Sequence, residues 1–165
     1  MIFVTVGSQK FQFNRLLEII DELVKNTNIN EEIFAQTGYS DYQPKYFQYK
    51  NFLDREEFEN WEKKADIIIT HGGTGAIVGA VKNKKKVIAI SRLARYGEHV
   101  DDHQKQIITE FNERNLIYGL LDLKNYSELK AAIEYVKTHK FNTYISNTQT
   151  VINSIEKFIR SQVDD

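Results

Sequence analysis

Residues 67–81 read IIITHGGTGAIVGAV and combine three local signals. The short apolar run at 67–70 is typical of a parallel strand that is covered on both faces. The loop HGGTGA at 71–76 follows this run, and the apolar stretch from Ala76 to Val81 continues from the loop as a predicted helix. A strand that passes through a glycine-rich turn directly into a helix is the repeating unit of an α/β fold.

The rest of the chain repeats this alternation. Further short apolar runs predict strands at residues 2–6, 33–35, 87–90 and near 116–118. Apolar residues at helical spacing predict helices around residues 16–24, 58–65, 107–111, 129–136 and 151–159. Asp101 or Asp102 is the expected N-cap of the helix at 107–111. The pattern predicts an α/β fold with a doubly wound, Rossmann-like parallel sheet and right-handed crossovers.

Composition limits the classes of function. A chain of 165 residues predicts a single domain over residues 1–165. The net charge of -1 gives no steering toward nucleic acid, so we expect no nucleic-acid partner. Cysteine is absent, which excludes disulfides and thiolate chemistry. Met1 leads directly into a predicted strand rather than a signal peptide, and no apolar run reaches the roughly 18 residues of a membrane span. We therefore expect a cytoplasmic protein.

Ligands of open α/β sheets bind beyond the carboxyl ends of the strands. Four segments with unusual residues follow predicted strand ends, at 7–10, 36–39, 71–76 and 91–104. We expect these segments to converge on one edge of the sheet. The basic run at 82–86 precedes a strand instead, which places it at the opposite edge as a solvated surface.

The HGGTGA loop is the strongest candidate for an anion site. Glycines allow close approach of the backbone to a ligand, and the free N–H groups of a helix start attract anions. His71 can donate to a phosphate oxygen, and Thr74 adds a hydroxyl donor. The glycine spacing matches neither the dinucleotide fingerprint nor the Walker A loop. The alternative is a turn that only permits tight packing of the helix on the strand.

A second polar cluster is RYGEHVDDHQ at 95–104, which suits recognition of sugar hydroxyls. The alternatives are a solvated loop with Asp102 as N-cap, and a metal site formed by His99, Asp101 and His103. The segment Gly7-Ser8 either binds phosphate or only turns into the first helix, and the sequence leaves both open.

Aromatic residues near these loops have two interpretations. Trp61, Phe52 and Phe58 are more typical of core packing than of a base-stacking platform. Phe11 and Phe13 are candidate docking residues for a partner, although packing under the first helix is the more common role.

Four segments occur together: MIFVTVGSQKFQFNRLL at 1–17, QTGYSDY at 36–42, HGGTGAI at 71–77 and RYGEHVDDHQ at 95–104. This set resembles the glycosyltransferase family 28 C-terminal domain. Within that family it is most similar to short capsule and exopolysaccharide transferases and to the soluble catalytic subunit of the dolichol-linked UDP-GlcNAc transferase. The resemblance implies the C-terminal half of a GT-B fold, which binds a UDP-sugar as a substrate and needs no cofactor or metal.

The resemblance also implies roles for individual residues. His71 and His103 are the candidate catalytic residues. The candidate substrate-binding residues are Gly7, Ser8, Phe52, Gly72, Gly73, Thr74, Gly75, Glu98 and Gln104. In this scheme the loops at 7–8 and 71–75 face the diphosphate, His103 and Gln104 touch the donor sugar, and the backbone of 51–53 holds the uracil. Related enzymes place a glutamate for the ribose eight residues after the loop histidine. That position is Gly79 here, and Glu98 is a possible substitute.

The implied reaction is an inverting transfer of a hexose, with β-1,4-galactosyl transfer favoured and N-acetylglucosamine and glucuronic acid left open. The acceptor is a polyprenyl-diphosphate-linked saccharide, and relatives of this length pair with a membrane-anchored, acceptor-binding subunit. The chain would then be peripheral at the inner face of the membrane through that partner. Two rivals are a non-catalytic nucleotide-sugar-binding subunit that activates a partner transferase, and a metal-dependent hydrolase built on His71, His99 and His103.

Overall fold

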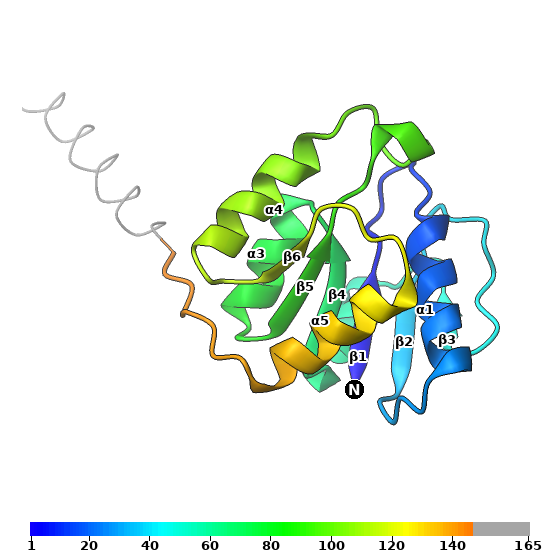
Figure 1. Cartoon of the computed structure of the whole chain (residues 1–165), viewed down its shortest axis with the longest axis horizontal. Coiled ribbons are helices and arrows are strands. Elements are labelled where there is room, and N and C mark those ends of the chain that lie inside the picture. Colours follow the sequence, from blue (N-terminus) through cyan, green and yellow to red (C-terminus); the bar gives the residue numbers. More distant parts are fainter. Residues whose placement is uncertain (147–165) are drawn as a thin grey trace, which may run out of the picture.

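The computed structural model describes residues 1–146, so the helix expected at 151–159 lies outside the described residues. One sheet contains six strands: β1 (Ile2–Thr5), β2 (Ile33–Gln36), β3 (Gln48–Lys50), β4 (Ile67–His71), β5 (Lys86–Ile90) and β6 (Tyr118–Leu120). The helices are α1 (Asn14–Asn26), α2 (Arg55–Lys64), α3 (Thr74–Lys82), α4 (His103–Glu113) and α5 (Tyr126–Thr138), with a 3-10 turn η1 (Ala94–Tyr96) (Figure 1).

All strand pairs are parallel, and the strand order is β3-β2-β1-β4-β5-β6. This order confirms the predicted doubly wound, Rossmann-like sheet. The chain direction across the sheet reverses between β1 and β4, which are neighbours with Thr5 opposite Thr70. In a sheet of this order the ligand crevice lies at that reversal, beyond the carboxyl ends of the strands.

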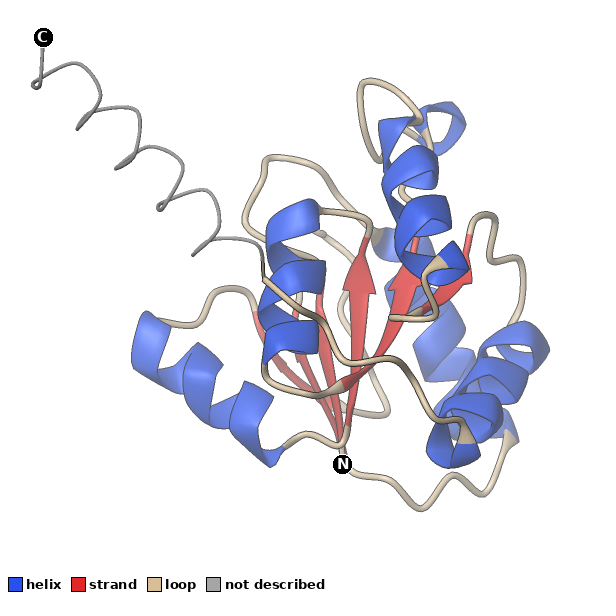
Figure 2. Ribbon diagram, turned by 90° about the vertical axis from the view of Figure 1, so that its left-hand side faces the viewer, coloured by secondary structure: helices blue, strands red, loops and turns tan. Residues whose placement is uncertain are grey.

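Helices cover both faces of the sheet, as Figure 2 shows edge-on. One buried cluster lies under α1 and α5 and includes Val4, Ile69 and Ile133. The other lies under α2, α3 and α4 and includes Phe3 and Ile77. Because both faces are buried, the central strands read as continuous apolar runs, which is why the sequence predicted them well.

The apolar pattern did not predict β3, and it predicted the start of β6 two residues too early. Strand β3 is at the sheet edge and alternates exposed, half-buried and exposed residues, so it has no apolar run. Leu116 and Ile117 are buried in the core before β6 begins at Tyr118.

The cap of α4 also differs from expectation in detail. Asp102 occupies the N-cap position, but Asp101 Oδ1 accepts the His103 N–H at 3.0 Å while Asp102 Oδ1 accepts the Ala94 N–H. None of the helices in residues 1–146 has the length and apolar character needed to cross a membrane.

Candidate functional site

A cleft of about 720 Å³ opens at the carboxyl edge of the sheet, between α2 and α3. The ends of β1, β2 and β4 form its floor through Thr5, Gln36 and His71. Its walls are the 7–9 loop, residues 53–62 leading into α2, and the 73–79 segment at the start of α3. The cleft therefore lies at the reversal of strand order, where the fold predicts a ligand.

The 71–76 loop uses its N–H groups in two ways. The Gly72 N–H donates to Gln104 Oε1 at 3.0 Å, and the Gly73 N–H donates to His71 Nδ1 at 3.0 Å. Gly73 is the N-cap of α3, so the N–H groups of residues 74–76 have no partner within the helix. Thr74 and Gly75 are exposed and line the cleft. The anion-attracting donors of this loop are therefore at residues 74–76 rather than at Gly72 and Gly73.

His71 is buried between this loop and the 7–9 loop. Burial, together with the charge of Arg92, lowers the pKa of His71 to about 4, so the ring is neutral at pH 7. Its Nδ1 accepts the Gly73 N–H and lies 3.4 Å from the Gln104 Nε2. A neutral imidazole with Nδ1 as acceptor carries its proton on Nε2. His71 is therefore a hydrogen-bond donor at the cleft, through Nε2–H.

The first loop needs glycine at residue 7. Gly7 has φ of +80°, and a Cβ at this position would lie 2.6 Å from His71 Nε2. Any side chain would displace the imidazole from the cleft. Gly7, Ser8 and Gln9 all line the cleft, facing the start of α3 across it.

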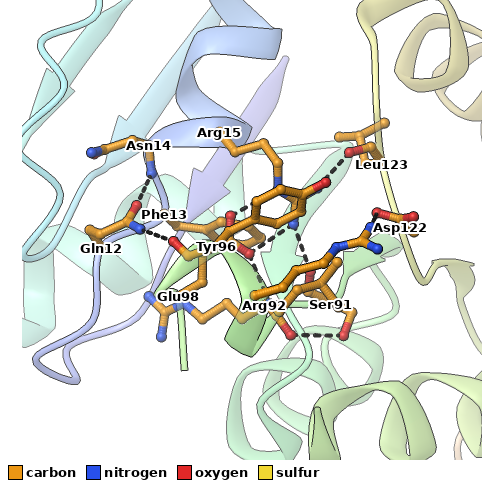
Figure 3. A network of polar contacts seen from close by, with 12 residues as sticks. Gln12, Phe13, Asn14, Arg15, Ser91, Arg92, Tyr96, Glu98, Asp122 and Leu123 are labelled. Carbon is orange, nitrogen blue, oxygen red and sulfur yellow. Dashed lines mark hydrogen bonds and ion pairs between the residues drawn. The ribbon is translucent and has the colours of Figure 1, made fainter. Parts of the chain in front are cut away.

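The 95–104 segment does not come together at the cleft. Glu98, expected as a substitute ribose ligand, is fully buried instead. Arg15 Nε and Nη2 donate to its two oxygens at 2.8 Å each (Figure 3). The Leu93 N–H also donates to its Oε2. No local sequence pattern predicts this pair, because the partners are 83 positions apart.

Gln104 and His103, expected to touch the donor sugar, both lie outside the lining of the cleft. Gln104 is buried, and its Oε1 accepts the N–H groups of Gly72 and Arg92 at 3.0 and 3.1 Å. Its amide thus fixes the 71–76 loop from behind. His103 is exposed at the start of α4 and is not part of the cleft lining. His99 packs on Phe11, with ring centroids 5.0 Å apart.

The aromatic residues separate into core and surface. Trp61 stacks on Phe34 at 3.9 Å and Phe58 packs edge-on against Phe3 at 5.2 Å, so both belong to the core, although Phe58 also borders the cleft. Phe52 is 46% exposed and packs against Tyr39 beside the cleft. Phe13 is fully buried and packs under α1, which agrees with a role in the core rather than in docking a partner.

One wall of the cleft is acidic, and the sequence pattern did not predict it. Glu59 and Glu62 of α2 line it, together with Arg55, which is paired with Glu59 at 2.9 Å. Glu62 Oε1 is 4.0 Å from the position that a Cβ at Gly79 would occupy. The i, i+4 and i+7 spacing of residues 55, 59 and 62 shows that they share a helix face, but only the fold shows that this face borders the cleft.

Within residues 1–146, no group of three or more histidine or carboxylate side chains is arranged to hold a metal ion.

Comparison with known proteins agrees with this architecture. The profile of the glycosyltransferase family 28 C-terminal domain matches residues 1–160. No curated protein sequence matches the chain.

Several solved structures share the fold. The glycotransferase of kitacinnamycin has a TM-score of 0.64 and 14% identity, over 84% of this chain and 35% of that chain. MurG of Acinetobacter baumannii has a TM-score of 0.62 and 15% identity, over 95% and 49%. The solution structure of ALG13 has a TM-score of 0.55 and 16% identity, over 93% of both chains.

The chain thus spans 35% of the kitacinnamycin enzyme and 49% of MurG, whereas it spans 93% of ALG13. At these identities the likeness shows the fold, which is that of the C-terminal, Rossmann-like half of GT-B glycosyltransferases. Because the family profile covers nearly the whole sequence, the chain belongs to the glycosyltransferase family 28 C-terminal domain family.

Proposed function

We propose that the chain is the donor-binding, catalytic subunit of a UDP-sugar-dependent glycosyltransferase. The observation that carries this proposal is the cleft at the strand-order reversal, where unpaired N–H groups at the start of α3 face the 7–9 loop. A helix start with free N–H groups favours a phosphate group through both hydrogen bonds and the helix dipole.

The diphosphate binds between these two loops. The N–H groups of residues 74–76 and the Thr74 hydroxyl donate from one side, and Gly7 and Ser8 lie on the other. His71 donates its Nε2–H from the floor. Because His71 is neutral and held in this tautomer by Gly73, it stabilises the charge that develops on the departing UDP without needing to lose a proton.

The nucleoside extends toward α2. The Leu53 N–H is fixed by Gln36 Oε1 at 3.1 Å, which orders the backbone of 51–53 for uracil recognition. Glu62 lies beside Gly79; Asn83 holds its Oε2 at 2.7 Å, and its Oε1 takes the ribose hydroxyls through two acceptor lone pairs. Glu98 is committed to Arg15 and does not take part.

The reaction is an inverting, metal-independent hexosyl transfer, with galactose as the donor sugar and a β-1,4 linkage. The acceptor is a polyprenyl-diphosphate-linked saccharide of capsule or exopolysaccharide synthesis. The cleft lies at the carboxyl edge of the sheet, and a second domain that faces this edge provides the acceptor side of the reaction centre. A membrane-anchored subunit provides that domain and the general base, and it holds this chain at the inner face of the membrane. His103 is exposed. As a candidate catalytic residue, it contacts the donor sugar or the acceptor.

The test is reconstitution with membranes that contain or lack the partner, supplied with radiolabelled UDP-galactose and the lipid-linked acceptor. We expect transfer only with chain and partner together, and a loss of transfer for Thr74→Ala. Transfer by the chain alone would overturn the need for a partner. Transfer that persists when His71 and Thr74 are both replaced would instead indicate a non-catalytic subunit that activates its partner.

A further inference from the structure

Arg92 is a buried cation beneath the donor site. It follows β5, and its side chain is fully buried. Its Nη2 donates to the carbonyl of Val6 at 2.5 Å and to that of Phe11 at 3.2 Å. These two carbonyls stand at the two ends of the 7–10 loop, which carries Gly7 and Ser8 into the cleft. One guanidinium group therefore ties both ends of the loop together.

The charge of Arg92 is not neutralised in contact. Glu98 is the buried carboxylate of this region, and Arg15 and the Leu93 N–H occupy both of its oxygens (Figure 3). Among the described residues, Arg92 Nε and Nη1 have no hydrogen-bond partner. Two buried or half-buried cations thus share one carboxylate, which leaves one positive charge in excess. Burial lowers the pKa of Arg92 to about 10, so it remains charged at pH 7.

Such a charge is costly to bury. An ion taken out of water without a paired partner destabilises the folded state strongly, and two guanidinium nitrogens without partners add to this cost. The neighbouring ring of Phe13 offers only a cation–π contact at 5.4 Å. The two carbonyls need a hydrogen-bond donor at this position but not a full positive charge.

We infer that Arg92 is a positioning residue of the donor site, which fixes the 7–10 loop and supplies a buried positive charge whose counter-ion is the bound diphosphate. The second half of this inference rests on the proposed function. The diphosphate brings negative charge to the loop whose ends Arg92 holds. In the low dielectric beneath the loop, the attraction between the two charges is weakened less than it is in water. Binding of the diphosphate then offsets the free-energy cost of the unpaired buried charge in the unliganded domain.

Three variants separate the two roles. Arg92→Lys keeps the charge but replaces the rigid guanidinium, whose Nη2 donates to both carbonyls, with an ammonium on a shorter and more flexible stem. Arg92→Met removes both the charge and the donors. Arg114→Met is the matched control, because Arg114 is exposed at the end of α4 and pairs with Glu110. Each variant is measured by hydrogen exchange of the amides in residues 7–11, by thermal unfolding, and by calorimetry with UDP and with uridine.

We expect Arg92→Met to bind UDP at least about tenfold more weakly while its uridine affinity stays within about twofold, since only UDP carries the diphosphate. Its melting temperature without ligand should equal or exceed that of the wild type, and UDP should raise that temperature less. Both Arg92 variants should show faster exchange in residues 7–11, with Arg92→Lys retaining most of the UDP affinity. Arg114→Met should match the wild type throughout.

Equal losses for UDP and uridine, or wild-type exchange in the loop, would overturn the inference. If Arg92→Met does not fold, the counter-ion role is contradicted, and Arg92→Lys alone then decides the loop role. If the wild type binds no UDP, the proposed function fails. Loop exchange still decides the structural half of the inference in that case, because it requires no ligand.

Discussion

The loops at 71–76 and 95–104 have similar compositions, but only the first lines the cleft. Both follow a strand, both carry a histidine, a hydroxyl or amide group and glycine, and both were predicted to bind the donor. The first lines the cleft, with Thr74 and Gly75 exposed to it. The second turns Glu98 and Gln104 inward, where both are buried, while residues 101–103 stay exposed away from the cleft lining.

The difference lies in what each loop is attached to. The 71–76 loop joins β4 directly to α3, so local geometry fixes its N–H groups at the carboxyl edge. The 95–104 loop is longer, and its conformation depends on distant partners such as Arg15. A polar residue in such a loop can support the site from behind as readily as it can line it. Substitutions in the two loops should therefore separate stability from binding.

Glu98→Ala should have the largest effect, and the effect should be on stability. It leaves Arg15 buried without its carboxylate, which costs about 3–5 kcal/mol of unfolding free energy. Urea denaturation measures this loss, with Glu110→Ala on the surface of α4 as the control. A stable Glu98→Ala protein with weakened UDP binding would return Glu98 to the ligand site.

The pH dependence of stability should report on His71. Its pKa is lowered to about 4 in the folded protein, first by burial and then by the charge of Arg92. Below pH 6.5 the unfolded chain therefore binds more protons than the folded one. The contribution of His71 to the free energy of unfolding is fully present above pH 6.5 and is lost as pH falls toward 4. The loss should approach about 3 kcal/mol.

Urea denaturation between pH 7 and pH 4 measures this dependence, with His71→Asn as the comparison. The free energy of unfolding should fall less steeply with decreasing pH in the variant, because the variant lacks the His71 contribution. Identical slopes in the two proteins would contradict a buried, neutral His71.

Gln104→Ala tests whether this residue supports the loop or reads the sugar. The substitution leaves the buried N–H groups of Gly72 and Arg92 without an acceptor, so we expect a stability loss of about 1–3 kcal/mol. UDP and UDP-sugar affinities should fall together because the loop itself shifts. Unchanged stability with a loss specific to UDP-sugar would favour the sugar-reading role expected from the family resemblance.

Thr74→Ala should show the opposite behaviour at a smaller scale. Thr74 is exposed, so stability should change by less than about 0.5 kcal/mol. UDP binding should weaken by about 1–2 kcal/mol through the lost hydrogen bond to a charged group. Gly75→Ala is a useful companion, because a Cβ at Gly75 meets nothing within 4 Å and so tests ligand approach without steric cost inside the domain. Wild-type UDP affinity in both variants would remove the start of α3 from the site.

The sequence predicted the parts of the fold that local patterns encode. Four of the six strands, β1, β2, β4 and β5, appear as apolar runs because they are buried on both faces, and the HGGTGA loop is recognisable because its glycines directly follow such a run. The edge strand β3 escaped notice because its residues alternate between solvent and interior. The burial of Glu98, the acidic wall of α2 and the buried charge of Arg92 depend on contacts between distant segments, which no local spacing encodes.

The central claim is that the cleft between α2 and α3 binds the UDP moiety of the donor. Titration of ¹⁵N-labelled protein with UDP, followed by amide chemical shifts, tests it most directly. We expect the largest shifts at the amides of Gly7, Ser8 and residues 74–76, with little change around residues 84–86, at the opposite edge of the sheet. Largest shifts at that opposite edge, or no saturable shift at all, would contradict it.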